Sequence, residues 1–248
     1  MVSGGEDHSS VFLLAVTAPN STGGSNYQGL NGALLYSRSL DGGETWDIHN
    51  QILPGMDSTK YDGFWADCYA FAEPKDNIIA FVVGSSLTDL FLMKSIDFGQ
   101  TFEKTFIWQN PLENLQPNDT LYSVDGSISI ALDNEGKAHV VFGIIGQHLV
   151  NTSIALDRSV DGIGYWNEDM FPFSSNYNAL NPMGGLESEM IPDYNLIGWS
   201  QDINGNGQLD FIDFENYGIF GISSMVQIVI DEGNRIFVGF TSITEGYD

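Results

Sequence analysis

Twelve residues, DINGNGQLDFID at 202–213, carry oxygen-bearing groups at alternate positions around a glycine. Calcium takes about six to eight oxygen ligands, and alternating carboxylate and amide side chains on a tight turn supply such a set. The apolar Leu209 at the eighth position suits a residue that packs inward. We therefore predict a structural calcium site with the ligands Asp202, Asn204, Asn206, Gln208, Asp210 and Asp213. The competing interpretation is a polar turn rich in Asn and Gly.

Two carboxylates offer a second kind of chemistry. Asp67 in FWADCYAFA and Asp125 in YSVDGSISI each come just before a predicted strand. Two facing carboxyl groups can act as acid and as base or nucleophile on a glycosidic bond. The competing interpretation is that each side chain caps its strand by accepting a backbone N–H. A glycoside hydrolase that uses Asp67 and Asp125 is therefore the alternative hypothesis, and a role without catalysis is favoured.

The elements that must position these groups are β-strands. Short runs rich in Val, Ile and Phe recur along the chain, separated by Gly, Asn and Asp. Runs of this kind bounded by turn residues predict strands, and long amphipathic helical patterns are nearly absent. Four predicted strands cover residues 11–18, 77–84, 137–144 and 234–242. The sequence predicts an all-β fold.

One hairpin pattern occurs three times in the sequence, in CYAFAEPKDNIIAFVVG, SISIALDNEGKAHVVFG and SMVQIVIDEGNRIFVGF. The glycines near the end of each copy, Gly84, Gly143 and Gly239, are 59 and then 96 residues apart. A unit of about 55 to 60 residues with four short strands has the size of a β-propeller blade. We predict one domain of about four units over 1–248, with an insertion at roughly 167–220. An antiparallel sandwich is the competing fold.

Two turns repeat at this spacing, and a third is a degenerate copy. An Asp accepts hydrogen bonds from nearby backbone N–H groups and holds a tight turn, while Gly permits a backbone conformation closed to other residues. The final aromatic is expected to fold beneath the turn. The complete turns contain Ser39, Asp41, Gly43, Thr45 and Trp46, and then Ser95, Asp97, Gly99, Thr101 and Phe102; the degenerate copy keeps Ser159, Asp161 and Trp166.

This pattern resembles the Asp-box, or BNR repeat, of sialidase-like β-propellers. The resemblance implies a turn between the third and fourth strands of a blade, on the blade periphery, with a structural and not a catalytic role. Sialidases also need a cluster of arginines, and Arg38 and Arg158 directly precede box serines, so sialidase activity is disfavoured. Phrases such as FLMKSIDFGQTFEKTFIWQNP and YNLIGWSQDINGNG resemble secreted Asp-box proteins of Bacteroidetes, which often carry a C-terminal sorting domain. Because such propellers usually have six blades, we expect a fragment of a longer protein.

The charge balance limits the partners. The chain has 33 acidic and 8 basic residues in 248, a formal net charge of −25. A surface of this sign repels phosphate backbones and anionic lipid, so nucleic-acid binding is not expected, and no apolar run is long enough for membrane insertion. The single cysteine excludes an intrachain disulfide. We predict a secreted or cell-surface protein with a binding or scaffolding role, whose partner is a glycan or an extracellular protein.

Overall fold

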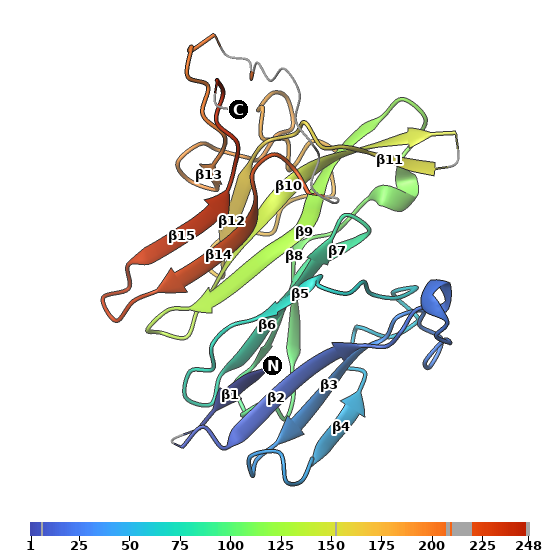
Figure 1. Cartoon of the computed structure of the whole chain (residues 1–248), viewed down its shortest axis with the longest axis vertical. Coiled ribbons are helices and arrows are strands. Elements are labelled where there is room, and N and C mark those ends of the chain that lie inside the picture. Colours follow the sequence, from blue (N-terminus) through green and yellow to red (C-terminus); the bar gives the residue numbers. More distant parts are fainter. Residues whose placement is uncertain (6, 152, 207–208, 210–219, 247–248) are drawn as a thin grey trace.

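The part of the chain that the structure describes forms four antiparallel sheets, which follow one another in space in the order of the sequence (Figure 1). The computed structural model describes residues 1–5, 7–151, 153–206, 209 and 220–246. In this part of the chain the helical elements are two short 3₁₀ turns, η1 (Asn20–Thr22) and η2 (Leu112–Asn114). The all-β prediction is confirmed.

The first two sheets each have four strands in sequence order. The first contains β1 (Val2–Gly4), β2 (Ser10–Val16), β3 (Leu34–Ser39) and β4 (Ile48–Gln51). The second contains β5 (Tyr69–Phe71), β6 (Ile79–Ser85), β7 (Thr88–Ser95) and β8 (Glu103–Trp108). Their turns come where the Gly, Asn and Asp clusters predict them.

The third sheet is longer and has an extra strand. Its members are β9 (Thr120–Leu132), β10 (Ala138–Val150), β11 (Ser153–Asp157), β12 (Ile163–Asn167) and β13 (Leu196–Gly198). β10 pairs with β9 on one side, and with β12 and β11 on the other. The far ends of β9 and β10, together with β11, therefore extend beyond the body of the molecule (Figure 1). The fourth sheet is the hairpin of β14 (Ser224–Ile230) and β15 (Ile236–Thr241).

The sheets pack face to face, so the central strands are apolar on both faces. In β6, Phe81 and Val83 point into the core shared with the first sheet, while Ala80 and Val82 point into the core shared with the third. Burial of one such large side chain is worth about 1.5–3 kcal/mol. A strand buried on both faces reads as a continuous apolar run and not as an alternating one. This explains runs such as NIIAFVVG.

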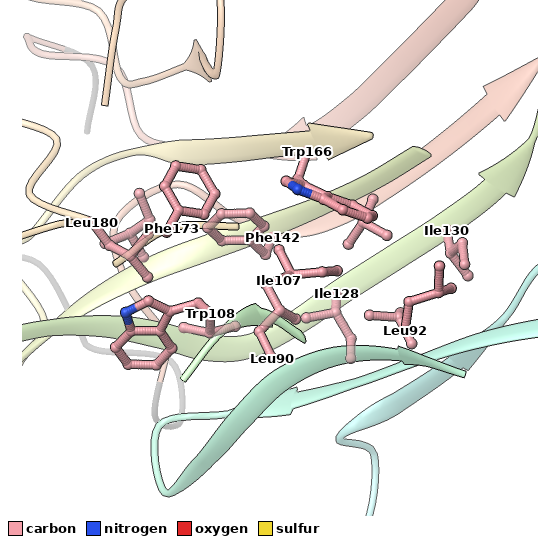
Figure 2. Packing of buried hydrophobic residues seen from close by; sticks show 14 of the residues in the cluster. Leu90, Leu92, Ile107, Trp108, Ile128, Ile130, Phe142, Trp166, Phe173 and Leu180 are labelled. Carbon is pink, nitrogen blue, oxygen red and sulfur yellow. The ribbon is translucent and has the colours of Figure 1, made fainter. Parts of the chain in front are cut away.

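The core between the second and third sheets is the largest (Figure 2). Leu90, Leu92 and Trp108 from the second sheet face Ile128, Phe142 and Trp166 from the third. A smaller core joins the third sheet to the terminal hairpin through Val141, Ile163, Val226 and Ile228. The third sheet therefore buries one face against the second sheet and its other face against the terminal hairpin.

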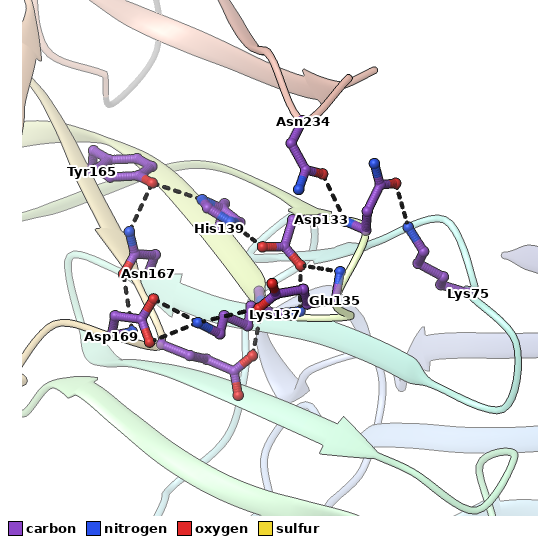
Figure 3. A network of polar contacts seen from close by, with 12 residues as sticks. Lys75, Asp133, Glu135, Lys137, His139, Tyr165, Asn167, Asp169 and Asn234 are labelled. Atoms are coloured by element: carbon purple, nitrogen blue, oxygen red, sulfur yellow. Dashed lines mark hydrogen bonds and ion pairs between the residues drawn. The ribbon is translucent and has the colours of Figure 1, made fainter. Parts of the chain in front are cut away.

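The hairpin turns of neighbouring sheets are also joined by hydrogen bonds. Lys75 Nζ donates to Asn134 Oδ1 at 2.8 Å, and the backbone N–H of Asn134 donates to Asn234 Oδ1 at 2.8 Å (Figure 3). These residues belong to the turns after β5, β9 and β14. The same end of each of these three sheets is therefore held against its neighbour.

Candidate functional site

The turn after β3 is closed by its own side chains. Ser39 Oγ donates to Asp41 Oδ1 at 2.8 Å and accepts the backbone N–H of Gly43 at 2.8 Å. Thr45 donates its backbone N–H to Asp41 Oδ1 at 2.8 Å and its hydroxyl to Asp41 Oδ2 at 2.5 Å. These hydrogen bonds, those from Thr45 first, lower the pKa of Asp41. The carboxylate is engaged within its own turn.

The turn after β7 repeats this arrangement. Asp97 Oδ1 accepts the Ser95 hydroxyl at 2.7 Å, and the Thr101 hydroxyl donates to Asp97 Oδ2 at 2.6 Å. Hydrogen bonds from Thr101 are the largest cause of the lowered pKa of Asp97, about 2. Both serines are the last residues of the third strand in their sheets. The two turns thus have the same position and the same internal bonds.

The two final aromatic residues differ. Phe102 packs against Tyr36 and Phe81, with ring centroids 5.0 and 5.5 Å away. Trp46 is 37% exposed. Phe102 therefore anchors its turn as expected, whereas Trp46 is only partly covered.

The first sheet reaches across to the second turn. Tyr36 Oη donates to the carbonyl oxygen of Gly99 at 3.0 Å. Arg38 donates to the carbonyl oxygen of Phe98 at 2.9 Å and to Gln100 Oε1 at 2.6 Å, and it also pairs with Asp47. Arg38, which the sequence placed beside a box serine at the periphery, therefore joins two sheets.

The residues Ser159, Asp161 and Trp166 do not form a turn of the same kind. Ser159 and Asp161 come before β12, and Trp166 lies within that strand. Asp161 Oδ2 accepts the backbone N–H and hydroxyl of Ser200, and its Oδ1 accepts the hydroxyl of Ser223 at 2.5 Å. The Asp161 carboxylate therefore ties the third sheet to the segments around the terminal hairpin. Because the extra strand β11 comes between β10 and β12 in the sequence, this Ser-x-Asp sequence lies in the connection before β12. In the first two sheets the corresponding turn lies after the third strand.

Strand register identifies the residues that occupy the turn position in the third sheet. Ser39 pairs with Val11, Ser95 with Ile79, and in the third sheet Asn167 pairs with His139. Asn167 Oδ1 accepts the backbone N–H of Asp169 at 2.9 Å, and Lys137 Nζ contacts both carboxylate oxygens of Asp169 (Figure 3). Asn167 thus occupies the serine position but donates its amide N–H to Tyr165 Oη, and Asp169 pairs with Lys137 instead of a threonine hydroxyl. No Asp-box spelling marks this segment, so the sequence pattern missed it.

A cation links the second sheet to this third turn. Lys94 directly precedes Ser95, as Arg38 precedes Ser39. Lys94 Nζ donates to Glu168 Oε2 at 2.6 Å, and the same oxygen accepts the backbone N–H of Ala138. The residue before the turn serine therefore reaches the turn region of the following sheet in both cases.

The predicted calcium loop lies only partly within the described residues. Gln208, Asp210 and Asp213 fall outside them. Asp202 Oδ1 accepts the backbone N–H of Gly205 at 2.7 Å, and Asn204 Oδ1 accepts that of Asn206 at 2.9 Å. Glu245 contacts this segment, with its carboxylate accepting the N–H of Ile203 at 2.9 Å. Among the described residues no group of three or more His, Cys, Asp or Glu side chains is placed to hold a metal ion.

Asp67 and Asp125 do not form an open pair. Asp125 has 0% exposure, and its carboxylate accepts the N–H of Ser127 at 2.7 Å and the hydroxyl of Ser224 at 2.9 Å. Burial raises the pKa of Asp125 to about 6. Asp67 lies in an exposed position just before β5, with a φ of 63°. A fully buried carboxylate makes no contact with a substrate in solvent, so Asp125 acts here as a link between β9 and β14.

The loop that ends at β5 exposes an aromatic ring. Trp65 is 61% exposed. The backbone on both sides is fixed, because the N–H of Phe64 donates to the carbonyl of Gly32 at 2.7 Å and Cys68 Sγ donates to the carbonyl of Trp65 at 2.7 Å. Burial raises the pKa of the Cys68 thiol to about 11, so it remains a donor at neutral pH. The indole is therefore presented from a loop whose backbone is hydrogen-bonded on both sides.

The extension of the third sheet brings three further polar side chains together. Thr120 Oγ1 lies 3.1 Å from His148 Nδ1, and His148 Nε2 lies 3.6 Å from Asp157 Oδ2. Thr120 pairs with His148 across β9 and β10, and Asp157 pairs with Gly146 across β10 and β11. The sequence offered no signal for this cluster, because only the register of three strands brings together residues 28 and 9 positions apart.

Sequence comparisons do not place the chain in a family, since no protein-family model and no curated protein matches it. Among solved structures it is similar to the NanB sialidase from Streptococcus pneumoniae, with 15% identity, a TM-score of 0.35, and coverage of 92% of this chain and 25% of that one. It is also similar to the intramolecular trans-sialidase from Ruminococcus gnavus, with 11% identity, a TM-score of 0.32, and coverage of 70% and 34%. The chain thus spans a quarter to a third of those two chains. In its described part no helix is long and apolar enough to cross a membrane.

Proposed function

We propose that the chain is part of a secreted or surface-displayed sialidase-like β-propeller of the Bacteroidetes type, and that it binds an extracellular partner without cleaving a glycosidic bond. Two four-stranded sheets and a longer third sheet, packed face to face, support blades. The bonds that Asp41 and Asp97 accept inside their own turns support a structural role for the Asp-boxes.

The exposed indole of Trp65 carries the binding part of this proposal. An aromatic ring that is 61% exposed leaves apolar surface in water, which is unfavourable unless a partner covers it. The hydrogen bonds around Phe64 and Cys68 restrain the backbone that carries the ring, so this loop loses less conformational entropy when a ligand arrives. Trp is also enriched among binding hot spots, together with Tyr and Arg.

A glycan is the ligand class that this loop suits best. The flat apolar face of an indole packs against the C–H face of a sugar ring. Asp67, two residues further on, is exposed and offers a carboxylate to sugar hydroxyl groups. With a net charge of −25, the chain favours a neutral glycan over an acidic one. Binding to a protein partner through the same ring is the alternative outcome.

An oligosaccharide array tests this assignment. We expect the full chain to bind neutral oligosaccharides, and Trp65→Ala to bind about tenfold more weakly or worse, which is the size of an aromatic hot-spot loss. Trp199→Ala is the matched control, since Trp199 is another exposed tryptophan and lies outside this loop. Equal binding by Trp65→Ala and the unaltered chain would contradict the assignment. If no oligosaccharide binds but the chain retains an extracellular protein, the partner of Trp65 is a protein and not a glycan.

Two further experiments address catalysis and calcium. We expect no release of fluorophore from a methylumbelliferyl sialoside, because Asp125 is buried. Hydrolysis that Asp67→Asn abolishes would support the glycoside hydrolase instead.

We also propose that the loop at 202–213 binds structural calcium. The melting temperature should then fall when a chelator is added and recover with excess calcium. An unchanged melting temperature would exclude a stabilising ion.

A further inference from the structure

We propose that Thr120, His148 and Asp157 form a nucleophile–base–carboxylate relay that hydrolyses uncharged carboxylic esters. This activity is independent of glycan binding at Trp65. The three side chains come from β9, β10 and β11, the strands that extend beyond the body of the molecule (Figure 1). Such a relay is recognised by the geometry and roles of its members and not by their order in the sequence.

The hydroxyl and the imidazole are within reach of each other. The distance of 3.1 Å between Thr120 Oγ1 and His148 Nδ1 lies in the range expected for a nucleophile and its general base. For this role the imidazole needs an unprotonated Nδ1 and a proton on Nε2. The His148 side chain is 38% exposed, so an ester can approach it from solvent.

The carboxylate that faces Nε2 is held in position. Asp157 Oδ2 lies 3.6 Å from His148 Nε2, while Asp157 Oδ1 accepts the N–H of Ser159 at 3.0 Å and its hydroxyl at 2.5 Å. Burial acts to raise the pKa of Asp157, but the bonds from Ser159 and the nearby His148 outweigh it, and the net pKa is lowered. Asp157 is therefore ionised at neutral pH and favours the proton on Nε2.

A phenol stands on the same face of the sheet. Tyr122 pairs with Gly146, and Asp157 pairs with Gly146 from the other side, so these residues form one row across three strands. Thr120 and Tyr122 are two residues apart on β9 and therefore project to the same face, about 7 Å apart. Burial, and then the charge of Asp157, raise the pKa of Tyr122. The phenol thus stays protonated and can donate to an oxyanion.

The reaction follows from these positions. Thr120 Oγ1 bonds to the ester carbonyl carbon while its proton moves to His148 Nδ1, and Tyr122 donates to the oxyanion. The intermediate collapses, the bond to the leaving alkoxide breaks, and His148 returns the proton to form the alcohol. A water molecule, deprotonated by His148, then attacks the acyl-threonine. The second intermediate collapses, the bond between the acyl carbon and Thr120 Oγ1 breaks, and His148 returns the proton to Oγ1. The products are a carboxylic acid and the restored Thr120 hydroxyl.

Uncharged esters fit the electrostatics. Asp157 lies beside the base, and the chain as a whole carries a net charge of −25. The Asp157 carboxylate would repel an anionic ester whose charge lies close to the reacting carbonyl. p-Nitrophenyl acetate is therefore the first probe, and p-nitrophenyl succinate, its anionic counterpart, should be the poorer substrate.

Matched variants test the relay. We expect Thr120→Val and His148→Gln each to lower the hydrolysis of p-nitrophenyl acetate by about 100-fold, the usual minimum for a general base. Thr105→Val on β8 and His49→Gln on β4 are controls, since both residues are exposed and lie outside the relay. They should retain the rate of the unaltered chain. Circular dichroism spectra of all four variants show whether they fold.

A covalent probe separates the relay from an isolated histidine. A fluorophosphonate should label Thr120, as seen by peptide mass spectrometry, and should fail to label it in His148→Gln. Undiminished ester hydrolysis by Thr120→Val would show that the imidazole acts alone and would overturn the proposal. A rate no higher than that of free imidazole, together with an unlabelled Thr120, would do the same.

Discussion

The turn after β3 and the turn after β7 contain the same hydrogen bonds but have different surroundings. In both, an Asp accepts a backbone N–H and a hydroxyl from the Thr four residues later. The second turn also lies against the first sheet, where Tyr36 and Arg38 bond to it. Trp46, at the end of the first turn, is partly exposed. The motif therefore sets the local conformation, while the neighbouring sheet decides how much a substitution costs.

Alanine at the two equivalent glycines should give the largest difference. Gly43 and Gly99 both have positive φ, at 94° and 75°, so alanine is strained at either position. A Cβ on Gly99 would lie 2.2 Å from Tyr36 Oη, whereas a Cβ on Gly43 meets nothing within 4 Å. We expect Gly99→Ala to cost about 1–3 kcal/mol more than Gly43→Ala, the usual cost of overpacking. Urea unfolding of both variants measures the difference; equal costs would show that Tyr36 moves aside freely.

Loss of the arginine that spans two sheets should have the next largest effect. Arg38 is almost fully buried and donates to two groups of the second turn. Arg38→Gln should lower the free energy of unfolding by about 2 kcal/mol, because hydrogen bonds to charged groups are worth about 1.5–3 kcal/mol. Arg235→Gln is the control, since Arg235 is exposed and pairs with Asp231 at the surface, which is worth below about 1 kcal/mol. A similar loss in both variants, measured by chemical denaturation, would contradict the role of Arg38.

Acid should affect the two turns equally and weakly. The pKa of Asp97 is lowered to about 2 and that of Asp41 is also lowered, so each carboxylate stabilises the fold above the ordinary pKa of about 4. For Asp97 this contribution is lost as the pH falls from about 4 through 2. Because Asp97 is solvated, we expect its share to be below about 1 kcal/mol. Unfolding of Asp41→Asn and Asp97→Asn at pH 7 and pH 3 should show the same reduced acid dependence. A marked difference between the two variants would mean that the neighbouring sheet also affects the pKa of the carboxylate.

The third sheet shows where sequence patterns fail. The spelling Ser-x-Asp pointed to Ser159 and Asp161, but the structure places Asn167 and Asp169 at the position equivalent to Ser39 and Asp41. An extra strand precedes β12 and shifts the position, and the substituted side chains make different bonds. The amino-acid sequence of a turn predicts its local geometry, but only the pairing of the preceding strand with its neighbour fixes the position of the turn in a sheet.

The sequence by itself determined the strands, the hairpins and the two closed turns. These features depend on residues a few positions apart, whose side chains and backbone groups meet whatever the rest of the chain does. The tertiary structure alone decided that Asp125 is buried, that Arg38 joins two sheets, and that Thr120 lies beside His148. Each of these contacts joins residues on different strands or sheets. The physical reason is that strand register and sheet packing, set by burial of both faces of each central sheet, bring distant residues together.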